Sequence, residues 1–160
     1  MIVSACVVVL ANILMYLFRH DILDVIPDMA FFYGPEQFYP MIQKMQNSGG
    51  GLRYIATAWT LDLLTPVGYS FFLGLAVIRL AKSFSSLVSF LAFVPLLAAV
   101  FDCLENLSVT LGIKNLPAIS DLLAQAAAAF STLKWIFVFA TLLFVIWRLV
   151  VLLLQREKAS

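Results

Sequence analysis

The sequence carries little charge. Asp, Glu, Lys and Arg make up 12% of its 160 residues, whereas 63% of the residues are hydrophobic and the mean hydropathy is +1.01. Soluble domains are roughly one-quarter charged and about half apolar. This composition excludes an ordinary soluble domain and indicates a protein of the lipid bilayer. The net charge of +1, with Lys and Arg scattered along the chain, offers no polyphosphate-binding surface, so we expect no nucleic acid partner.

Histidine and cysteine are also scarce, which excludes several kinds of site. His20 is the only histidine, so a Ser–His or Cys–His nucleophile pair would have to use it. Asp102-x-x-Glu105 lacks the Glu-x-x-His signature of di-iron bundles. Cys6 and Cys103 make neither a CxxC motif nor a zinc spacing. We therefore expect no metal site and no cofactor, although hard-cation binding by the acids described below stays open. The sequence does not decide whether the protein is an enzyme.

Long apolar runs fill most of the chain and predict transmembrane helices. About 20 apolar residues are needed to cross the hydrocarbon core. We predict an all-α integral membrane four-helix bundle with antiparallel, up-and-down spans, forming one transmembrane domain over residues 1–160. The first run has no basic n-region and no small-x-small cleavage site, so we expect it to be retained, with a cleaved signal peptide as the alternative. The predicted spans cover residues 1–18, 54–80, 87–113 and 122–147.

The start of the fourth span allows two interpretations. Ser120 and Asp121 are typical helix-capping residues and predict an early start, with Lys134 inside the span. The most apolar window, 135–154, would instead place Lys134 at its end as an interfacial anchor. We prefer the early start, because it gives a span similar in length to the two before it and leaves Arg148 to reach the far interface.

The segment 19–53 is the one sizeable extramembrane loop, because three prolines and four acidic residues interrupt its apolar character. Within it, Phe38, Met41, Ile42 and Met45 recur at helical spacing. This pattern predicts a short amphipathic helix over residues 35–46, lying on the membrane surface.

The positive charges set the expected orientation. If Lys134 is buried, five Lys and Arg residues flank the side that holds both termini and four flank the other side. The positive-inside rule then favours both termini in the cytoplasm. The first group is Arg79, Lys82, Arg148, Arg156 and Lys158, and the second is Arg19, Lys44, Arg53 and Lys114.

Four ionisable residues lie inside the predicted spans, where such groups are costly and rare. At a rise of about 1.5 Å per residue, Asp62, Asp102, Glu105 and Lys134 each lie about 12–18 Å from the same side of the bundle. We therefore expect them at similar depth, near the midplane, facing one another rather than the acyl chains.

Further polar positions share helix faces with these residues. Asp62 shares a face with Pro66 and Tyr69, and Asp102 and Glu105 share one with Asn106. Pro66 removes the hydrogen bond to the carbonyl of Asp62, so we expect a kinked, hydrated spot there. The predicted cluster that binds a ligand or shares a proton is Asp62, Asp102, Glu105, Asn106 and Lys134, with Pro66, Tyr69 and Arg53 in support.

Three carboxyl groups against one ammonium predict that at least one carboxyl is protonated at neutral pH. The simplest role of such a cluster is helix packing. A second role is binding of a lipid or another amphipathic small molecule. The alternatives are an accessory subunit or scaffold of a larger membrane complex, and proton- or ion-coupled transport by a homo-oligomer. Membrane lipids are the expected partners in every case.

Four spans with acids in the middle ones, and an acid followed by a proline at Asp62 and Pro66, resemble the general layout of the emopamil-binding-protein-like family. Members of that family bind sterols or related amphiphiles, and some are sterol isomerases. The histidine expected of the isomerases is missing from these spans. The resemblance therefore implies an intramembrane ligand pocket and assigns no role to any residue here.

Overall fold

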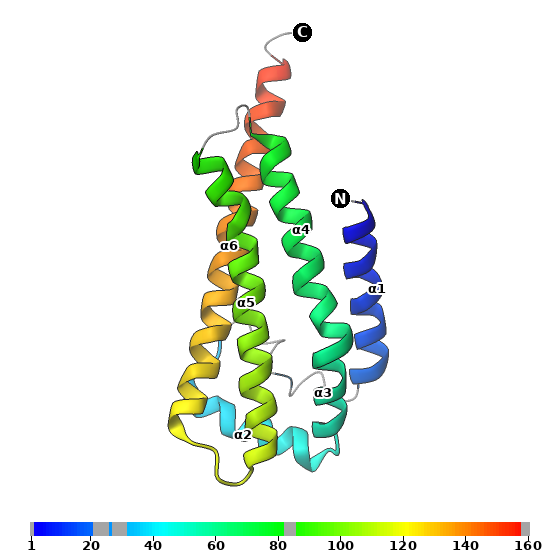
Figure 1. Cartoon of the computed structure of the whole chain (residues 1–160), viewed down its shortest axis with the longest axis vertical. Coiled ribbons are helices and arrows are strands. Elements are labelled where there is room, and N and C mark those ends of the chain that lie inside the picture. Colours follow the sequence, from blue (N-terminus) through cyan, green and yellow to red (C-terminus); the bar gives the residue numbers. More distant parts are fainter. Residues whose placement is uncertain (1, 21–25, 27–31, 82–85, 158–160) are drawn as a thin grey trace.

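The computed structural model describes residues 2–20, 26, 32–81 and 86–157, and over these residues all regular structure is helical (Figure 1). The elements are α1 (Ile2–Arg19), α2 (Pro35–Asn47), α3 (Gly51–Thr57), the π turn η3 (Ala58–Asp62), α4 (Leu63–Leu80), α5 (Ser86–Asn115) and α6 (Asp121–Glu157). The wide π-helical turn joins α3 to α4, so the two helices and the turn form one continuous rod.

Four of the helical rods are long and apolar enough to cross a membrane: Ile2–Arg19, Gly51–Leu80, Val88–Asn115 and Asp121–Gln155. They match the four predicted spans in number and in position. The second begins at Gly51 rather than near Tyr54, because the Tyr54 N–H donates to the Gly50 carbonyl at 2.8 Å and closes a helical turn there.

The early start predicted for the last helix agrees with the structure. The hydroxyl of Ser120 accepts a hydrogen bond from the Leu123 N–H at 3.2 Å, which caps α6 before Asp121. Lys134 therefore lies inside the helix, not at its end. With 37 residues and a rise of about 1.5 Å per residue, α6 is about 55 Å long, which exceeds the about 30 Å of hydrocarbon in a bilayer. Its C-terminal end extends past the other helices (Figure 1).

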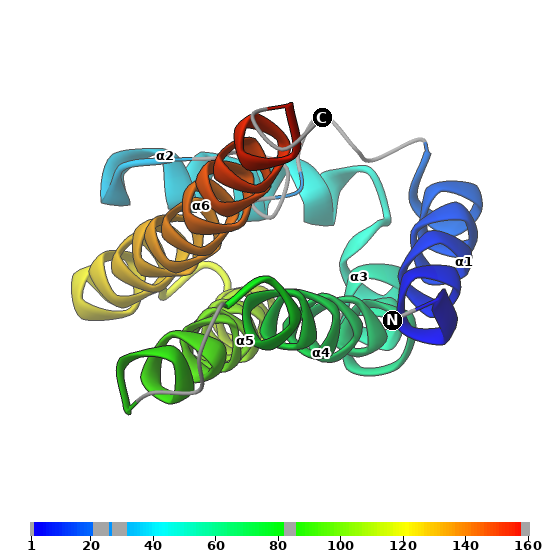
Figure 2. The ribbon, with the colours of Figure 1, turned by 90° about the horizontal axis from the view of Figure 1, so that it is seen from above.

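The four long rods follow one another around an arc. α1 packs on α4, α4 packs on α5, and α5 packs on α6, so that α1 and α6 stand at the two ends of the arc (Figure 2). Near the end of α4, Arg148 of α6 donates two hydrogen bonds to the Leu80 carbonyl, at 3.1 and 2.8 Å. This contact satisfies one of the carbonyls that a helix C-terminus leaves unpaired.

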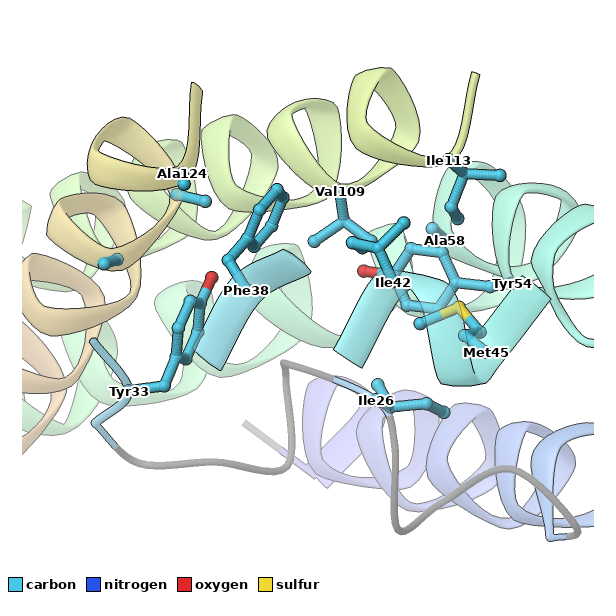
Figure 3. Packing of buried hydrophobic residues seen from close by; sticks show 12 residues of the cluster. Ile26, Tyr33, Phe38, Ile42, Met45, Tyr54, Ala58, Val109, Ile113 and Ala124 are labelled. Carbon is cyan, nitrogen blue, oxygen red and sulfur yellow. The ribbon is translucent and has the colours of Figure 1, made fainter. Parts of the chain in front are cut away.

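The helix α2 lies across one end of the bundle (Figure 1). It matches the predicted amphipathic helix closely, but its apolar face packs on α5 and α6 instead of facing lipid. Phe38, Ile42 and Met45 are fully buried (Figure 3), with Met41 partly buried beside them. The sequence pattern could not distinguish these surroundings, because a membrane surface and the end of a bundle both cover one apolar stripe. These side chains form an apolar end cluster with Ile26, Tyr33, Tyr54, Ala58, Val109, Ile113, Ala124, Ala127 and Ala128.

Candidate functional site

The first part of the site joins α5 to α6. The Lys134 ammonium nitrogen lies 3.0 Å from an Asp102 carboxylate oxygen and 2.5 Å from a Glu105 carboxylate oxygen. All three residues are buried, and Glu105 is 0% exposed. The acids are three residues apart and so share one face of α5, which lets a single lysine reach both.

The second part joins α1 to the rod of α3 and α4. Arg19 places one guanidinium nitrogen 3.4 Å from an Asp62 carboxylate oxygen and donates through Nε to the Thr57 hydroxyl at 2.5 Å. Its guanidinium carbon also lies 4.7 Å from the centre of the Tyr54 ring. The prediction that Arg19 begins the extramembrane loop was wrong: Arg19 is the last residue of α1, is 3% exposed and belongs to the buried site.

Asn106 connects the two parts. Its amide nitrogen donates to the same Asp62 oxygen at 3.3 Å, and its amide oxygen accepts from the Tyr54 hydroxyl at 2.7 Å. Because Asn106 lies one helical turn after Asp102, the two ion pairs are neighbours across α5. We call this set the ion-pair network. It consists of Arg19, Tyr54, Thr57, Asp62, Asp102, Glu105, Asn106 and Lys134.

The structure thus brings together the five residues proposed as the cluster, from α5, α6 and the π turn. Of the three supporting residues, Pro66 is buried in α4 and Tyr69 lines the cavity described next. Arg53 donates a hydrogen bond to the Phe18 carbonyl, beside Arg19 in the chain, at 3.5 Å.

A cavity of about 660 Å³ lies beside the ion-pair network, between α1 at one end of the arc and α6 at the other. The charged groups that line it are Arg19, Asp62, Asp102 and Lys134. Most of the remaining wall is apolar or aromatic. It includes Met15, Tyr16 and Ile26 from the N-terminal region, Tyr69, Phe72 and Leu73 from α4, and Trp135, Val138 and Leu142 from α6.

Two buried hydroxyls close to this region have no hydrogen-bond partner among the described residues. They belong to Tyr69 and Ser131. Tyr69 lines the cavity together with Asp62, Asp102 and Lys134. Buried polar groups are nearly always hydrogen-bonded in folded proteins. The Tyr69 hydroxyl on the cavity wall can therefore bond to a molecule bound there.

Among the described residues, the ion pairs of the network join two cations, Arg19 and Lys134, to three acids, Asp62, Asp102 and Glu105. In the part of the chain that the structure describes, no three His, Cys, Asp or Glu side chains are grouped so as to hold a metal ion.

Replacing Tyr54 with Phe should lower the free energy of unfolding by about 1–3 kcal/mol, because the change leaves a buried amide oxygen of Asn106 without its donor. Equilibrium unfolding in mixed detergent micelles would measure the effect. Tyr39→Phe, at a half-buried position of α2, is the matched control and should change stability by less than about 0.5 kcal/mol. Equal effects of the two changes would show that the Tyr54 hydrogen bond does not support the network.

Comparison of the chain with protein-family models, with curated proteins and with solved structures found no match. The resemblance to the emopamil-binding-protein-like family therefore stays one of layout, and function has to be inferred from the site itself.

Proposed function

We propose that this chain is a multi-pass membrane protein that binds a lipid or lipid-like amphiphile in the cavity between α1 and α6. The observation that carries the proposal is the composition of that cavity, whose wall holds four charged side chains among apolar and aromatic ones. Ligand pockets have volumes of about 300–1,000 Å³ and combine apolar walls with a few polar groups, and this cavity has both properties.

The position of the cavity favours a ligand that arrives from the bilayer. α2 and the apolar end cluster cover the end of the bundle next to the ion-pair network, which favours exclusion of water from that end. The cavity is lined by residues of α1, α4, α5 and α6. Because α1 and α6 stand at the two ends of the arc (Figure 2), a lateral entry between them is the natural path. The polar end of an amphiphile would meet the network, and its apolar part would lie along Phe72, Val138 and Leu142.

The helix arrangement supports the membrane topology in this proposal. Four rods that run up and down the bundle, each long enough to cross, favour antiparallel spans with both ends of the chain on one side. Burial of Arg19 and Lys134 leaves Lys44, Arg53 and Lys114 as the cations of the opposite side, against five on the side of the ends. The positive-inside rule then favours a cytoplasmic position for both ends.

The structure supports the accessory-subunit hypothesis less than it supports ligand binding. The outer face of α6 exposes large apolar side chains such as Leu143, Trp147 and Leu153. A bilayer covers such a surface without any protein partner, because its acyl chains are as apolar as leucine. The exposed face therefore does not favour a partner over lipid.

A bulky residue in the cavity should displace the bound molecule. Val138→Trp narrows the cavity, so we expect the amount of amphiphile that copurifies with the protein in mild detergent to fall about tenfold, which corresponds to about 1.4 kcal/mol of binding free energy. Mass spectrometry of the extracted lipids would measure it.

The matched control is Leu143→Trp, which makes a similar change on the same helix at a position that is 67% exposed. It should leave the copurified amphiphile unchanged. Loss of equal amounts from both variants would mean that the wild-type protein carries only surface lipid, and the proposed function would then be wrong.

A further inference from the structure

A second cavity, of about 410 Å³, lies between α4 and α5 and is lined by residues within Ser70–Ile78 and Ser89–Leu96. We call it the outer groove. On α4, its residue Ile78 follows Tyr69, which lines the first cavity, by nine positions. At about 100° per residue, nine positions make about two and a half turns, so the two residues lie on opposite faces of the helix. The outer groove therefore opens on the outer side of the arc (Figure 2), away from the cavity between α1 and α6.

Small residues between large ones produce the outer groove. A Cβ atom on Gly74 would lie 2.8 Å from the Ala92 carbonyl oxygen, so the two helices approach closely where these small lining residues meet. Phe71 of α4 and Phe93 of α5 are each 65% exposed and line the groove as well. A slender apolar molecule that lies along the two helices would thus contact both rings.

The polarity and the length of the outer groove match one hydrocarbon chain. Apart from Ser70 and Ser89, the lining residues are glycine, alanine or larger apolar ones. The Ser70 hydroxyl donates to the Pro95 carbonyl at 2.7 Å, so the protein itself satisfies this polar group. From Ser70 to Ile78 the helix rises about 12 Å, and half of the hydrocarbon core of a bilayer is about 15 Å thick. The groove thus extends over most of one leaflet, as an acyl chain does.

Basic residues lie at the end of the groove that is next to the end of α4. Arg79 is exposed, and it follows the lining residue Leu75 by four positions. Side chains four positions apart are neighbours on a helix surface, so Arg79 lies beside this end of the groove. At the same end of α4, Arg148 of α6 donates to the Leu80 carbonyl. Arginine binds phosphate through strong, charge-assisted hydrogen bonds, so these residues favour a phospholipid with a net negative head group.

We propose that the outer groove binds one acyl chain of an anionic phospholipid, whose phosphate meets Arg79. The lipid would belong to the leaflet on the side of the chain ends. The positive-inside rule favours the cytoplasm for that side, and the cytoplasmic leaflet carries anionic lipids. This inference uses the membrane position in the proposed function but not the amphiphile in the cavity between α1 and α6, so the two sites can be tested separately.

The test places one tryptophan at the outer groove and measures its quenching by brominated lipid. Phe93→Trp reports on the groove in a protein whose own three tryptophans are replaced with phenylalanine. Phe90→Trp is the matched control, because Phe90 lies on the same helix and is 63% exposed but does not line the groove. Each protein is reconstituted in phosphatidylcholine vesicles that contain rising fractions of dibrominated phosphatidylglycerol or dibrominated phosphatidylcholine.

At position 93, phosphatidylglycerol should bind about fivefold better than phosphatidylcholine, as expected for one basic residue beside an anionic head group. At position 90, the two lipids should differ by less than about twofold. Equal quenching by the two lipids at position 93, or the same preference at both positions, would overturn the proposal, because the groove would then hold only bulk lipid. Quenching at position 90 but by neither lipid at position 93 would also overturn it, and would show that a second copy or another protein covers the groove.

A charge variant checks the role of Arg79. Arg79→Gln should reduce the fivefold preference to less than about twofold, whereas Lys114→Gln, at an exposed site in the last turn of α5, should keep it. Val138→Trp, which narrows the cavity between α1 and α6, should also keep it, so this result and the proposed function can fail independently.

If the tryptophan variants do not fold, native mass spectrometry can measure the same lipid preference. The wild-type, Arg79→Gln and Lys114→Gln proteins would be taken from vesicles with equal amounts of the two lipids. A preference for phosphatidylglycerol that Arg79→Gln leaves unchanged would overturn the proposal.

Discussion

Replacing Lys134 with methionine is expected to lower the free energy of unfolding by about 3–5 kcal/mol, the cost of removing one partner from a buried ion pair. Asp102 and Glu105 would remain beside each other with no ammonium between them, and Glu105 has no access to solvent. Methionine keeps the length and apolar character of the side chain, so packing changes little. The loss would therefore come mainly from uncompensated charge.

Unfolding by a titration of sodium dodecyl sulfate into mixed micelles would measure this loss. Lys44→Met is the matched control, because Lys44 is exposed on α2, and it should change stability by less than about 0.5 kcal/mol. A variant that also carries Asp102→Asn and Glu105→Gln should recover most of the loss. If Lys134→Met costs under about 1 kcal/mol, the lysine does not compensate these acids.

Phe38→Ala should be comparably severe, with a loss of about 3–5 kcal/mol, because truncation of a buried phenylalanine leaves a cavity that its neighbours fill only in part. Phe38 is 0% exposed and belongs to the apolar end cluster, where its ring stacks with Tyr33 at a centroid distance of 6.4 Å (Figure 3). It also meets Gly112 so closely that a Cβ there would lie 3.0 Å from the ring. Phe38 therefore packs α2 directly against α5.

The same unfolding titration applies, with Phe32→Ala as the control, because Phe32 is 58% exposed. The control should cost less than about 1 kcal/mol. If α2 instead lay with its apolar face in the membrane, both changes would have similar small effects, and that result would contradict the packing of α2 on the bundle.

The positions of the long helices could be predicted because hydrophobic length is a strong local signal. The choice between two starts of the last helix was also predictable, since Ser120 is a capping residue and caps act over a few neighbouring residues. The sequence also indicated that the acids and Lys134 would face one another, because no lipid-facing position is favourable for an ionised group.

The role of Arg19 could not be predicted in the same way. An arginine at the end of an apolar run is typical of an interfacial anchor, and nothing local distinguishes an anchor from a buried partner. Its burial depends on how α1 packs on α4, where Gly68 leaves room for Val8. Contacts between distant segments of this kind do not appear in the spacing of residues along one helix.

The π turn at Ala58–Asp62 explains why the sequence did not predict that Tyr54 belongs to the ion-pair network. Tyr54 and Asp62 are eight residues apart, which in a regular helix of about 100° per residue puts them about 80° out of phase. A π turn accommodates roughly one extra residue without further rotation, so Tyr54 and Asp62 are separated by the rotation of about seven residues, which is about 20° short of two full turns. Both side chains therefore lie on nearly the same face, where both bond to Asn106. The π turn thus rotates one part of the rod relative to the other. The part before it places Tyr54 in the apolar end cluster, and the part from Asp62 onward lines the cavity.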